Sequence, residues 1–171
     1  IDKRVIRAVG DPEVRFREDP LRLLRGVRLA TELRIQIDER TIRGLGSIAS
    51  LVASLARERI REELMKILVA PRPSRSFNIM VRQGLLQSIP PELLEGYLKR
   101  QNQYHRYTIF KHIVETIDHV RPEPILRLTA LLHDIAKPRT RIKREGKWSF
   151  YGHEKESALL AEEILNRLKF S

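Results

Sequence analysis

The sequence contains no cysteine, so disulfide bonds and thiolate metal sites are excluded. It also contains no run of 18 apolar residues, so we expect no transmembrane helix and no membrane partner. The first residues, Ile1-Asp2-Lys3-Arg4, do not have the pattern of a signal peptide. These absences together predict a cytoplasmic setting.

The charge, in contrast, is strongly biased toward one sign. The 33 Lys and Arg residues outnumber the 22 Asp and Glu residues, which gives a net charge of +11. Cationic side chains that neutralise phosphates release counterions, so this excess predicts a polyanionic partner. The alternative is a basic surface that is only solvated. At 171 residues the chain is long enough to bury a core in one or two small domains.

Apolar residues recur at helical spacing along most of the chain, so the predicted fold is all-α. Residues 1–18 read as a connector and residues 99–108 as a polar linker. Asp38 and Ser74 are expected to cap two helices, and Gly44 and Gly46 to interrupt the first of these. The expected helices cover residues 19–33, 38–45, 47–55, 57–69, 74–83, 92–98, 109–120 and 124–135, and a last one opens at Gly152-His153-Glu154.

The stretch from Glu18 to Arg25 carries the most informative local pattern. Asp19 suits an N-cap and Pro20 the first helical position, so Asp19 and Arg22 should share one side of the first turn. A carboxylate only accepts hydrogen bonds and a guanidinium only donates them. Together they match the amino donor and ring-nitrogen acceptor of cytosine or adenine, and they oppose the reversed polarity of uracil and guanine. The alternative is a capped helix with a solvated ion pair.

Residues 4–38 carry further motifs around this pair. They are Arg7-Ala8-Val9-Gly10-Asp11-Pro12, Arg15-Phe16, Glu18-Asp19-x-x-Arg22, Leu24-Arg25 and Val27-Arg28. The run closely resembles the neck of the bacterial-type (class II) tRNA nucleotidyltransferase and poly(A) polymerase family. The resemblance implies that Asp19 and Arg22 read the Watson–Crick edge of the incoming CTP or ATP. It also places Arg25 and Arg28 as support for the nucleotide or its phosphates.

A second stretch resembles a later motif of the same neck, which buttresses the nucleotide-reading helix. The matching segments are Glu58-Arg59-Ile60, Glu63-Leu64 and Lys66-Ile67-Leu68. In this family a catalytic head precedes the neck and supplies a triphosphate-binding loop and metal-binding carboxylates. No Gly-rich loop followed by paired aspartates occurs here. We therefore expect no catalytic residue in this chain, Mg²⁺ held mainly by a head outside it, and a sequence that is a fragment or one piece of a split protein.

The histidines form another pattern. The doublet His133-Asp134 ends an apolar helix, and His112 lies about twenty residues upstream. This resembles the HD superfamily of helical, metal-dependent phosphohydrolases, which implies that His112, His133 and Asp134 are metal ligands and that His153 lines the site. Imidazoles and a carboxylate suit a divalent metal that activates water. The superfamily's distal aspartate has no counterpart after Asp134, so the alternative is a purely structural HD domain.

A basic segment separates this doublet from His153. Glu145-Gly146 predicts the turn of a hairpin. Cations and the aromatic side chains of Trp148, Phe150 and Tyr151 could grip an RNA backbone and stack on bases. The alternative is a solvated loop with its aromatics tucked inward. The predicted RNA-binding cations are Lys137, Arg139, Arg141, Lys143, Arg144 and Lys147.

These patterns predict a neck and body over residues 1–98 and an incomplete HD-type domain over 104–171. The expected function is a share in adding C and/or A to tRNA 3′ ends, with CTP and ATP as substrates and the tRNA acceptor arm as partner. CCA, CC, A and poly(A) addition all remain open. One alternative is an HD phosphohydrolase acting on 2′,3′-cyclic or terminal phosphates, and another is a non-catalytic RNA-binding module.

Overall fold

The computed structural model describes residues 4–101, 106–144 and 146–170, apart from the side chain of Arg144. Within these residues the strands form two small two-stranded sheets and helices dominate the rest, which confirms the predicted all-α fold. The α-helices are α1 (Pro12–Glu18), α2 (Leu21–Glu32), α3 (Glu39–Ser47), α4 (Arg57–Val69), α5 (Pro73–Arg82), α6 (Ile109–His119), α7 (Pro124–Leu132) and α8 (His153–Arg167). None of the described helices is long and apolar enough to cross a membrane.

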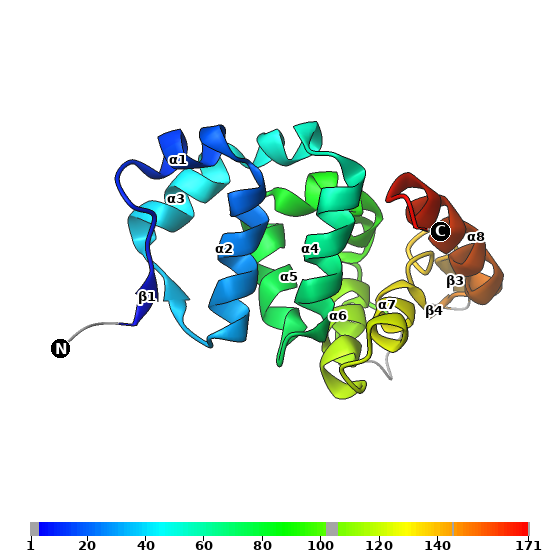
Figure 1. Ribbon diagram of the computed structural model, residues 1–171. Helices are drawn as coiled ribbons and strands as arrows, with labels where there is room; N and C mark the ends of the chain where they lie inside the picture. Colours follow the sequence, from blue (N-terminus) through cyan, green and yellow to red (C-terminus); the bar gives the residue numbers. More distant parts are fainter. Residues whose placement is uncertain (1–3, 102–105, 145, 171) are drawn as a thin grey trace.

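Helices α2, α4 and α5 pack against one another in the N-terminal half of the molecule, and α1 and α3 lie across one end of them (Figure 1). A short parallel pair, β1 (Val5–Ile6) and β2 (Gln36–Ile37), closes the outer side of α2. The helix over 57–69 has the predicted bounds. Its buried residues Ile60, Leu64 and Ile67 recur at helical spacing and face the other two helices.

Helix α3 begins as predicted and ends later. The Asp38 side chain accepts a hydrogen bond from the Thr41 backbone N–H, as an N-cap does. The helix then continues through Gly44 and Gly46 to Ser47, so the predicted interruption is wrong. Gly44 is needed for contact rather than for a break, because a Cβ there would lie 2.7 Å from the Pro12 Cβ. This glycine lets α1 and α3 approach closely.

Three other sequence predictions need correction. The connector over 1–18 contains helix α1, whose Asp11-Pro12 start is the same cap-plus-proline signal as Asp19-Pro20. The predicted Ser74 cap is wrong, because α5 begins at Pro73 and the Ser74 hydroxyl and N–H both donate to Asp118 on α6. The short helices expected over 47–55 and 92–98 are 3₁₀ segments, η1 (Ala49–Ser54) and η3 (Pro91–Gly96), and a further one, η2 (Leu85–Ser88), lies between them.

One continuous hydrophobic core runs from α1 to α8. Helices α6 and α7 pair with each other and pack on α5 and α4 respectively, while α8 lies at the far end against α7 (Figure 1). The predicted linker over 99–108 and the domain boundary at 104 fall partly in 102–105, outside the described residues. The predicted hairpin is present, with β3 (Ile142–Arg144) antiparallel to β4 (Lys147–Ser149).

The C-terminus of α2 closes in a motif that normally uses glycine. The Ile35 N–H donates to the Ala30 carbonyl and the Arg34 N–H to the Thr31 carbonyl, which is the double bond of a Schellman cap. Arg34 therefore adopts a left-handed backbone, with φ of 56°. For a residue with a Cβ this conformation costs about 1–2 kcal/mol. Lys169 holds the same position after α8, with φ of 58°.

Candidate functional site

The first candidate site lies where α1 meets α2. Asp19 has an extended backbone and Pro20 occupies the N-cap, so α2 starts at Leu21 rather than at the predicted residue 19. The shift follows from Pro20, whose ring disfavours helical geometry in the residue before it. Asp19 still serves the helix end, because its Oδ1 accepts a hydrogen bond from the Leu21 N–H at 3.2 Å.

Asp19 and Arg22 lie on the same turn, but different partners hold them. Asp19 Oδ1 is 3.4 Å from Arg59 Nη2, and Asp19 Oδ2 is 3.8 Å from Arg25 Nη1. Arg22 Nη1 donates to the Arg15 carbonyl at 2.8 Å and to Glu18 Oε2 at 2.9 Å. The structure thus fixes one acceptor and one donor separately, at the same end of α2.

Glu63 on α4 contacts two arginines of α2, Arg25 and Arg28. Its carboxylate is buried, and it accepts from Arg28 Nε at 2.9 Å and lies 3.6 Å from Arg25 Nε. Arg28 Nη1 also contacts Glu32 at 2.8 Å, so this predicted phosphate-supporting residue is occupied by two carboxylates. Arg25 links Glu63 to Asp19 and remains half-exposed. Glu63 therefore positions Arg25 and, through it, Asp19.

The contacts of Glu63 with its cationic neighbours shift its pKa. Burial raises its pKa, but hydrogen bonds from Arg28 and Lys66 outweigh burial and hold the pKa below its ordinary value. A carboxyl with a lowered folded-state pKa stabilises the fold above its unfolded-state pKa and loses that contribution as the pH falls. We expect the free energy of unfolding to fall as the pH drops below about 5, and to fall less steeply in Glu63→Gln. Urea unfolding of both proteins between pH 7 and pH 3 tests this, and equal slopes would contradict it.

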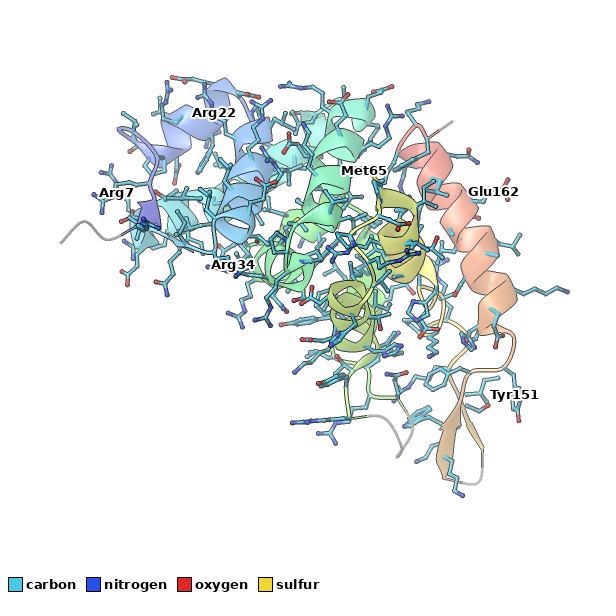
Figure 2. The ribbon with its side chains drawn as sticks, turned by 60° about the horizontal axis from the view of Figure 1, so that its bottom comes forward. Arg7, Arg22, Arg34, Met65, Tyr151 and Glu162 are labelled. Carbon is cyan, nitrogen blue, oxygen red and sulfur yellow. The ribbon has the colours of Figure 1, made fainter. Side chains whose placement is uncertain are left out.

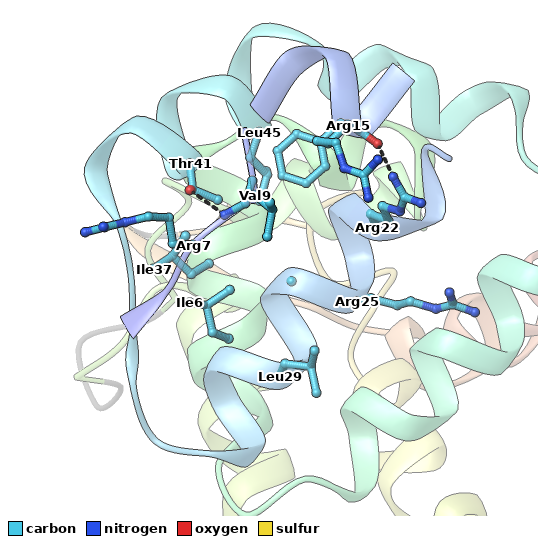
Figure 3. Close-up of a pocket in the computed structure, with 13 residues that line it drawn as sticks. Ile6, Arg7, Val9, Arg15, Arg22, Arg25, Leu29, Ile37, Thr41 and Leu45 are labelled. Carbon is cyan, nitrogen blue, oxygen red and sulfur yellow. Dashed lines mark hydrogen bonds between the residues drawn. The ribbon is translucent and has the colours of Figure 1, made fainter. Parts of the chain in front are cut away.

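A cavity of about 280 Å³ opens beside this end of α2 (Figure 3). Its apolar lining comes from β1, β2, α1, α2 and α3, and includes Ile6, Leu29 and Ile37. Arg22 and Arg25 line the same cavity. Gly26 lies between them and Leu29 on α2, and a Cβ there would meet nothing within 4 Å. The cavity thus combines an apolar wall with the guanidinium donors of Arg22 and Arg25, while the Asp19 carboxylate contacts Arg25 from outside the lining. An apolar wall beside directional donors is suited to a planar, polar-edged ligand such as a nucleobase.

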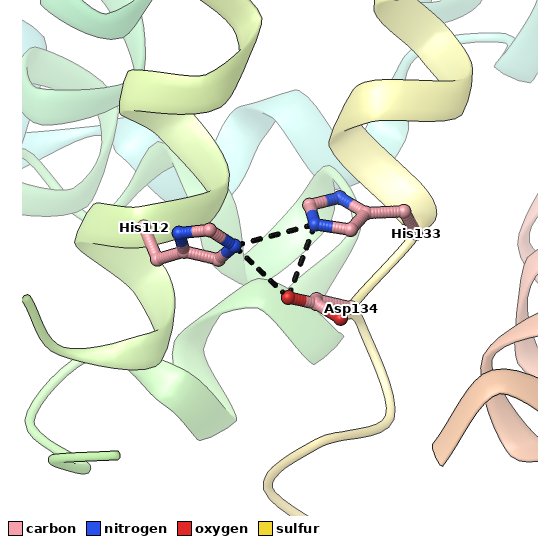
Figure 4. A group of neighbouring side chains, drawn as sticks. All are labelled: His112, His133 and Asp134. Carbon is pink, nitrogen blue, oxygen red and sulfur yellow. Dashed lines mark hydrogen bonds and ion pairs between the residues drawn. The ribbon is translucent and has the colours of Figure 1, made fainter. Parts of the chain in front are cut away.

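The second candidate site joins α6 to the segment after α7 (Figure 4). His112 Nε2 and His133 Nε2 lie 3.1 and 3.0 Å from Asp134 Oδ2, and the two imidazole nitrogens are 3.4 Å apart. Helix α7 ends at Leu132 instead of the predicted residue 135, and Asp134 turns inward. His133 Nδ1 donates to the Ala130 carbonyl, which leaves Nε2 directed at the cluster. The structure brings together all three ligands expected from sequence.

His153 and Lys137 complete the surroundings of Asp134. His153 Nε2 lies 3.3 Å from Asp134 Oδ1, and Lys137 Nζ lies 2.6 Å from Asp134 Oδ2. Burial raises the pKa of Asp134, but hydrogen bonds from His112, His133 and Lys137 outweigh it and lower the pKa. Burial lowers the pKa of His133, but the hydrogen bond and negative charge of Asp134 outweigh burial and raise this pKa above its ordinary value. The donor set of two imidazoles and one carboxylate fits a divalent metal, which would compete with Lys137 for the carboxylate.

The predicted RNA-binding cations do not form one exposed row. Lys137 is held by Asp134, and Arg139 pairs with Glu95 at 2.7 Å. Arg141 stacks on Trp148, with its guanidinium carbon 3.5 Å from the ring centroid, and Lys143 lies over the same ring. Phe150 packs against the core, whereas Tyr151 is exposed. Lys147 is exposed, and the Arg144 side chain lies outside the described atoms.

Some residues at the first site were not singled out as site residues from sequence. The sequence places Arg59 only within the buttressing motif, yet its side chain contacts Asp19, which lies 40 residues away in the chain. Arg15 and Glu18 hold Arg22. Glu18 could have been found from its i,i+4 spacing to Arg22, whereas no local signal connects Arg59 with Asp19.

Comparisons with known proteins match both halves of the chain. Residues 34–96 match the family profile described as "Probable RNA and SrmB- binding site of polymerase A", and residues 106–170 match the HD domain profile. The chain is 35% identical to an A-adding tRNA nucleotidyltransferase of Deinococcus radiodurans, over 99% of this chain and 41% of that protein. It is 36% identical to a CC-adding tRNA nucleotidyltransferase of Thermus thermophilus, over 90% of this chain and 38% of that protein.

A solved structure has the same fold. The crystal structure of the Bacillus stearothermophilus CCA-adding enzyme in complex with CTP aligns with a TM-score of 0.54 and 24% identity. The alignment covers 98% of this chain and 47% of that one. The chain thus spans less than half the length of the relatives described here.

Proposed function

Because the chain belongs to the bacterial-type tRNA nucleotidyltransferase and poly(A) polymerase family, we propose that it takes part in adding C and/or A to tRNA 3′ ends. In that reaction the tRNA 3′ oxygen bonds to the α-phosphorus of CTP or ATP, and pyrophosphate leaves. Mg²⁺ and the carboxylates that hold it belong to a catalytic head outside this chain. This chain selects the incoming base and holds the acceptor arm.

The observation that carries this proposal is the separate anchoring of Asp19 and Arg22 at the start of α2, where Arg22 also lines the cavity. Asp19 is held by Arg25 and Arg59, and it offers an acceptor to the amino group of cytosine or adenine. Arg22 is held by Arg15 and Glu18, and it offers a donor to the neighbouring ring nitrogen. Anchors of this kind restrict side-chain rotation, so the edge keeps its polarity when no nucleotide is bound.

The experiment uses the full-length protein with Mg²⁺, labelled CTP or ATP, and three tRNAs that end before CCA, after C and after CC. Incorporation into one or more of these tRNAs is the expected result. The acceptor that is extended, and the nucleotide used, would distinguish CCA, CC and A addition. No incorporation on any acceptor would overturn the proposal. Salt-sensitive tRNA binding without incorporation would favour the RNA-binding module.

A metal-dependent phosphohydrolase acting on 2′,3′-cyclic or terminal phosphates is the second candidate function. The converging nitrogens of His112 and His133 on Asp134 favour it. These three residues would hold the metal, which would lower the pKa of a bound water. The neighbouring His153, 3.3 Å from Asp134, would line the site. Release of phosphate from such substrates, measured with Mn²⁺ or Ni²⁺, tests this activity.

Metal binding itself has a separate readout. A metal at about a hundred times its dissociation constant stabilises the folded state by about 2.7 kcal/mol. We expect Mn²⁺ or Ni²⁺ to raise the melting temperature of the wild type by about 5–10 °C and to have little effect on His133→Ala. His119→Ala, on the same helix as His112, is the matched control and should respond like the wild type. An equal rise in His133→Ala would exclude this site.

A further inference from the structure

We propose that a basic groove at the C-terminal end of α2 binds RNA phosphates of the tRNA acceptor arm. The groove measures about 860 Å³ and lies between the end of α2, the loop to β2, α5 and α6. Figure 2 shows Arg34, which lines it, at the opposite end of α2 from Arg22. The basic groove is therefore separate from the base-reading edge. Its RNA partner rests on the proposed function.

The charge of the basic groove is almost entirely positive. One acidic residue, Glu115, lines it, and the amides of Gln36 and Asn78 add neutral donors. Guanidinium and ammonium groups gathered around an open groove suit phosphate oxygens better than any neutral ligand. The five cations that line it are Arg34, Arg72, Arg75, Arg82 and Lys111.

Two of these cations are exposed and have no ion-pair partner among the described residues, namely Arg34 and Arg82. The remaining cations have weaker or non-acidic contacts. Arg72 is 3.8 Å from Asp118, and Arg75 donates to the Ile35 carbonyl, which holds the loop that carries Arg34. Lys111 lies over the Tyr107 ring.

Other arginines of α2 differ in this respect. Arg22 pairs with Glu18, and Arg28 pairs with Glu32 and Glu63. Charges neutralised within the protein offer little to a polyanion. The basic groove therefore keeps a net positive charge that its own surroundings do not neutralise.

The backbone of Arg34 supports a role for its side chain. Arg34 occupies the left-handed position of the Schellman cap, where glycine fits without strain. A side chain kept in a strained conformation points to a function when it also lines a site. The groove thus contains a feature that stability alone does not explain.

The position of the groove fits the path of an RNA strand. Helix α2 has twelve residues, so its two ends are about 18 Å apart at 1.5 Å per residue. This equals about five base steps at 3.4 Å each along one strand. A 3′ end placed at the Asp19 end of α2 would have its upstream phosphates within reach of the basic groove. Residues 34–96, which match the RNA-binding family profile, include four of the five cations.

The test compares Arg34→Gly/Arg82→Gln with the wild type in the full-length protein. Binding of a tRNA without its CCA end is measured by fluorescence anisotropy at several salt concentrations. We expect the affinity at low salt to fall about 5–20-fold, and the slope of log K against log salt to decrease by about 1–2, since two phosphate contacts are lost. The single variant Arg34→Gly should melt at the wild-type temperature or above it, because glycine relieves the left-handed strain.

Lys169→Gly is the matched control. It removes one positive charge from the same left-handed cap position, but on α8 and away from the groove. Its tRNA affinity and salt slope should equal those of the wild type. Equal affinity losses in Lys169→Gly and Arg34→Gly would show a general charge effect and overturn the groove assignment.

Two further outcomes separate the proposals. If the wild type extends tRNA but the double variant binds tRNA as tightly as the wild type, the groove proposal fails and the proposed function stands. If the wild type extends no tRNA, the proposed function fails. The comparison of tRNA affinity between the wild type and the double variant then decides by itself whether the groove binds RNA. Weaker ATP binding with unchanged tRNA binding would assign the groove to a nucleotide and overturn its assignment to RNA.

Discussion

Full-length protein carrying Asp19→Ala is expected to incorporate UTP and GTP alongside CTP and ATP. The variant loses the only acceptor of the proposed edge, which is held 3.4 Å from Arg59 and 3.8 Å from Arg25. A pair of directional hydrogen bonds to a base edge discriminates by about 1–3 kcal/mol. We therefore expect the ratio of kcat/KM for CTP or ATP over UTP or GTP to fall about 5–150-fold. Single-nucleotide incorporation with each of the four nucleotides measures this ratio.

The matched control for that substitution is Asp11→Ala. Asp11 also caps a helix and pairs with an arginine, Arg40, but it lies at the start of α1. Its loss should lower stability, because α1 loses its N-cap, and should leave base choice unchanged. Equal selectivity in Asp19→Ala and the wild type would refute the base-reading role. A loss of activity without a loss of selectivity would leave Asp19 as a cap that only supports α2.

The largest expected effect on stability comes from Arg127→Met. Arg127 is a buried residue of α7, and its Nη1 donates to the Leu68 and Ala70 carbonyls at 2.6 Å each. Its Nε donates to the Val120 carbonyl at 3.1 Å. The guanidinium therefore fastens the end of α4 to the helices of the HD half. Methionine would fill the space but leave three carbonyls without this donor.

Each buried acceptor that loses its partner costs about 1–3 kcal/mol. Burial lowers the pKa of Arg127, which shows that this charge is costly to bury, so its removal offsets part of the loss. We expect the free energy of unfolding to fall by about 3 kcal/mol, out of the 5–15 kcal/mol typical of a domain. Urea unfolding followed by circular dichroism measures this change.

Arg121→Met is the control for Arg127→Met. Arg121 lies in the connection between α6 and α7, and its side chain is 77% exposed beside Glu123. A surface substitution of this kind should change stability by about 0.5 kcal/mol or less. If Arg127→Met cost less than about 1 kcal/mol, water would be replacing the guanidinium, and Arg127 would not be what fastens α4 to α7.

Local sequence signals predicted much of the helical framework. The helix over 57–69 has the predicted bounds, because its apolar spacing and its charged outer face are both set within a few turns. The Asp38 cap was also predicted and confirmed. The predicted start of α2 is two residues too early, since Pro20 acts on the residue before it as well as on its own position. These features depend on residues that are neighbours in the sequence, so they can be predicted from the sequence alone.

The candidate sites were predicted only in part. The motif of Asp19 and Arg22 is local and was found, and so was the His133-Asp134 doublet with His112. The contacts that fix these residues are not local, since Arg59 reaches Asp19 across 40 residues and Glu63 reaches Arg28 across 35. The spacing of residues in the sequence does not predict which helix faces pack against each other.

The sequence by itself determined the family, the all-α fold and the identity of the two motifs, because each rests on residue types at short, fixed separations. The tertiary structure decided which charges remain available to a ligand. It turned Lys137 toward Asp134 and Arg139 toward Glu95, and it left Arg34 and Arg82 exposed in one groove. A cation's availability depends on whether packing brings an acid within reach, and packing is a property of the whole chain.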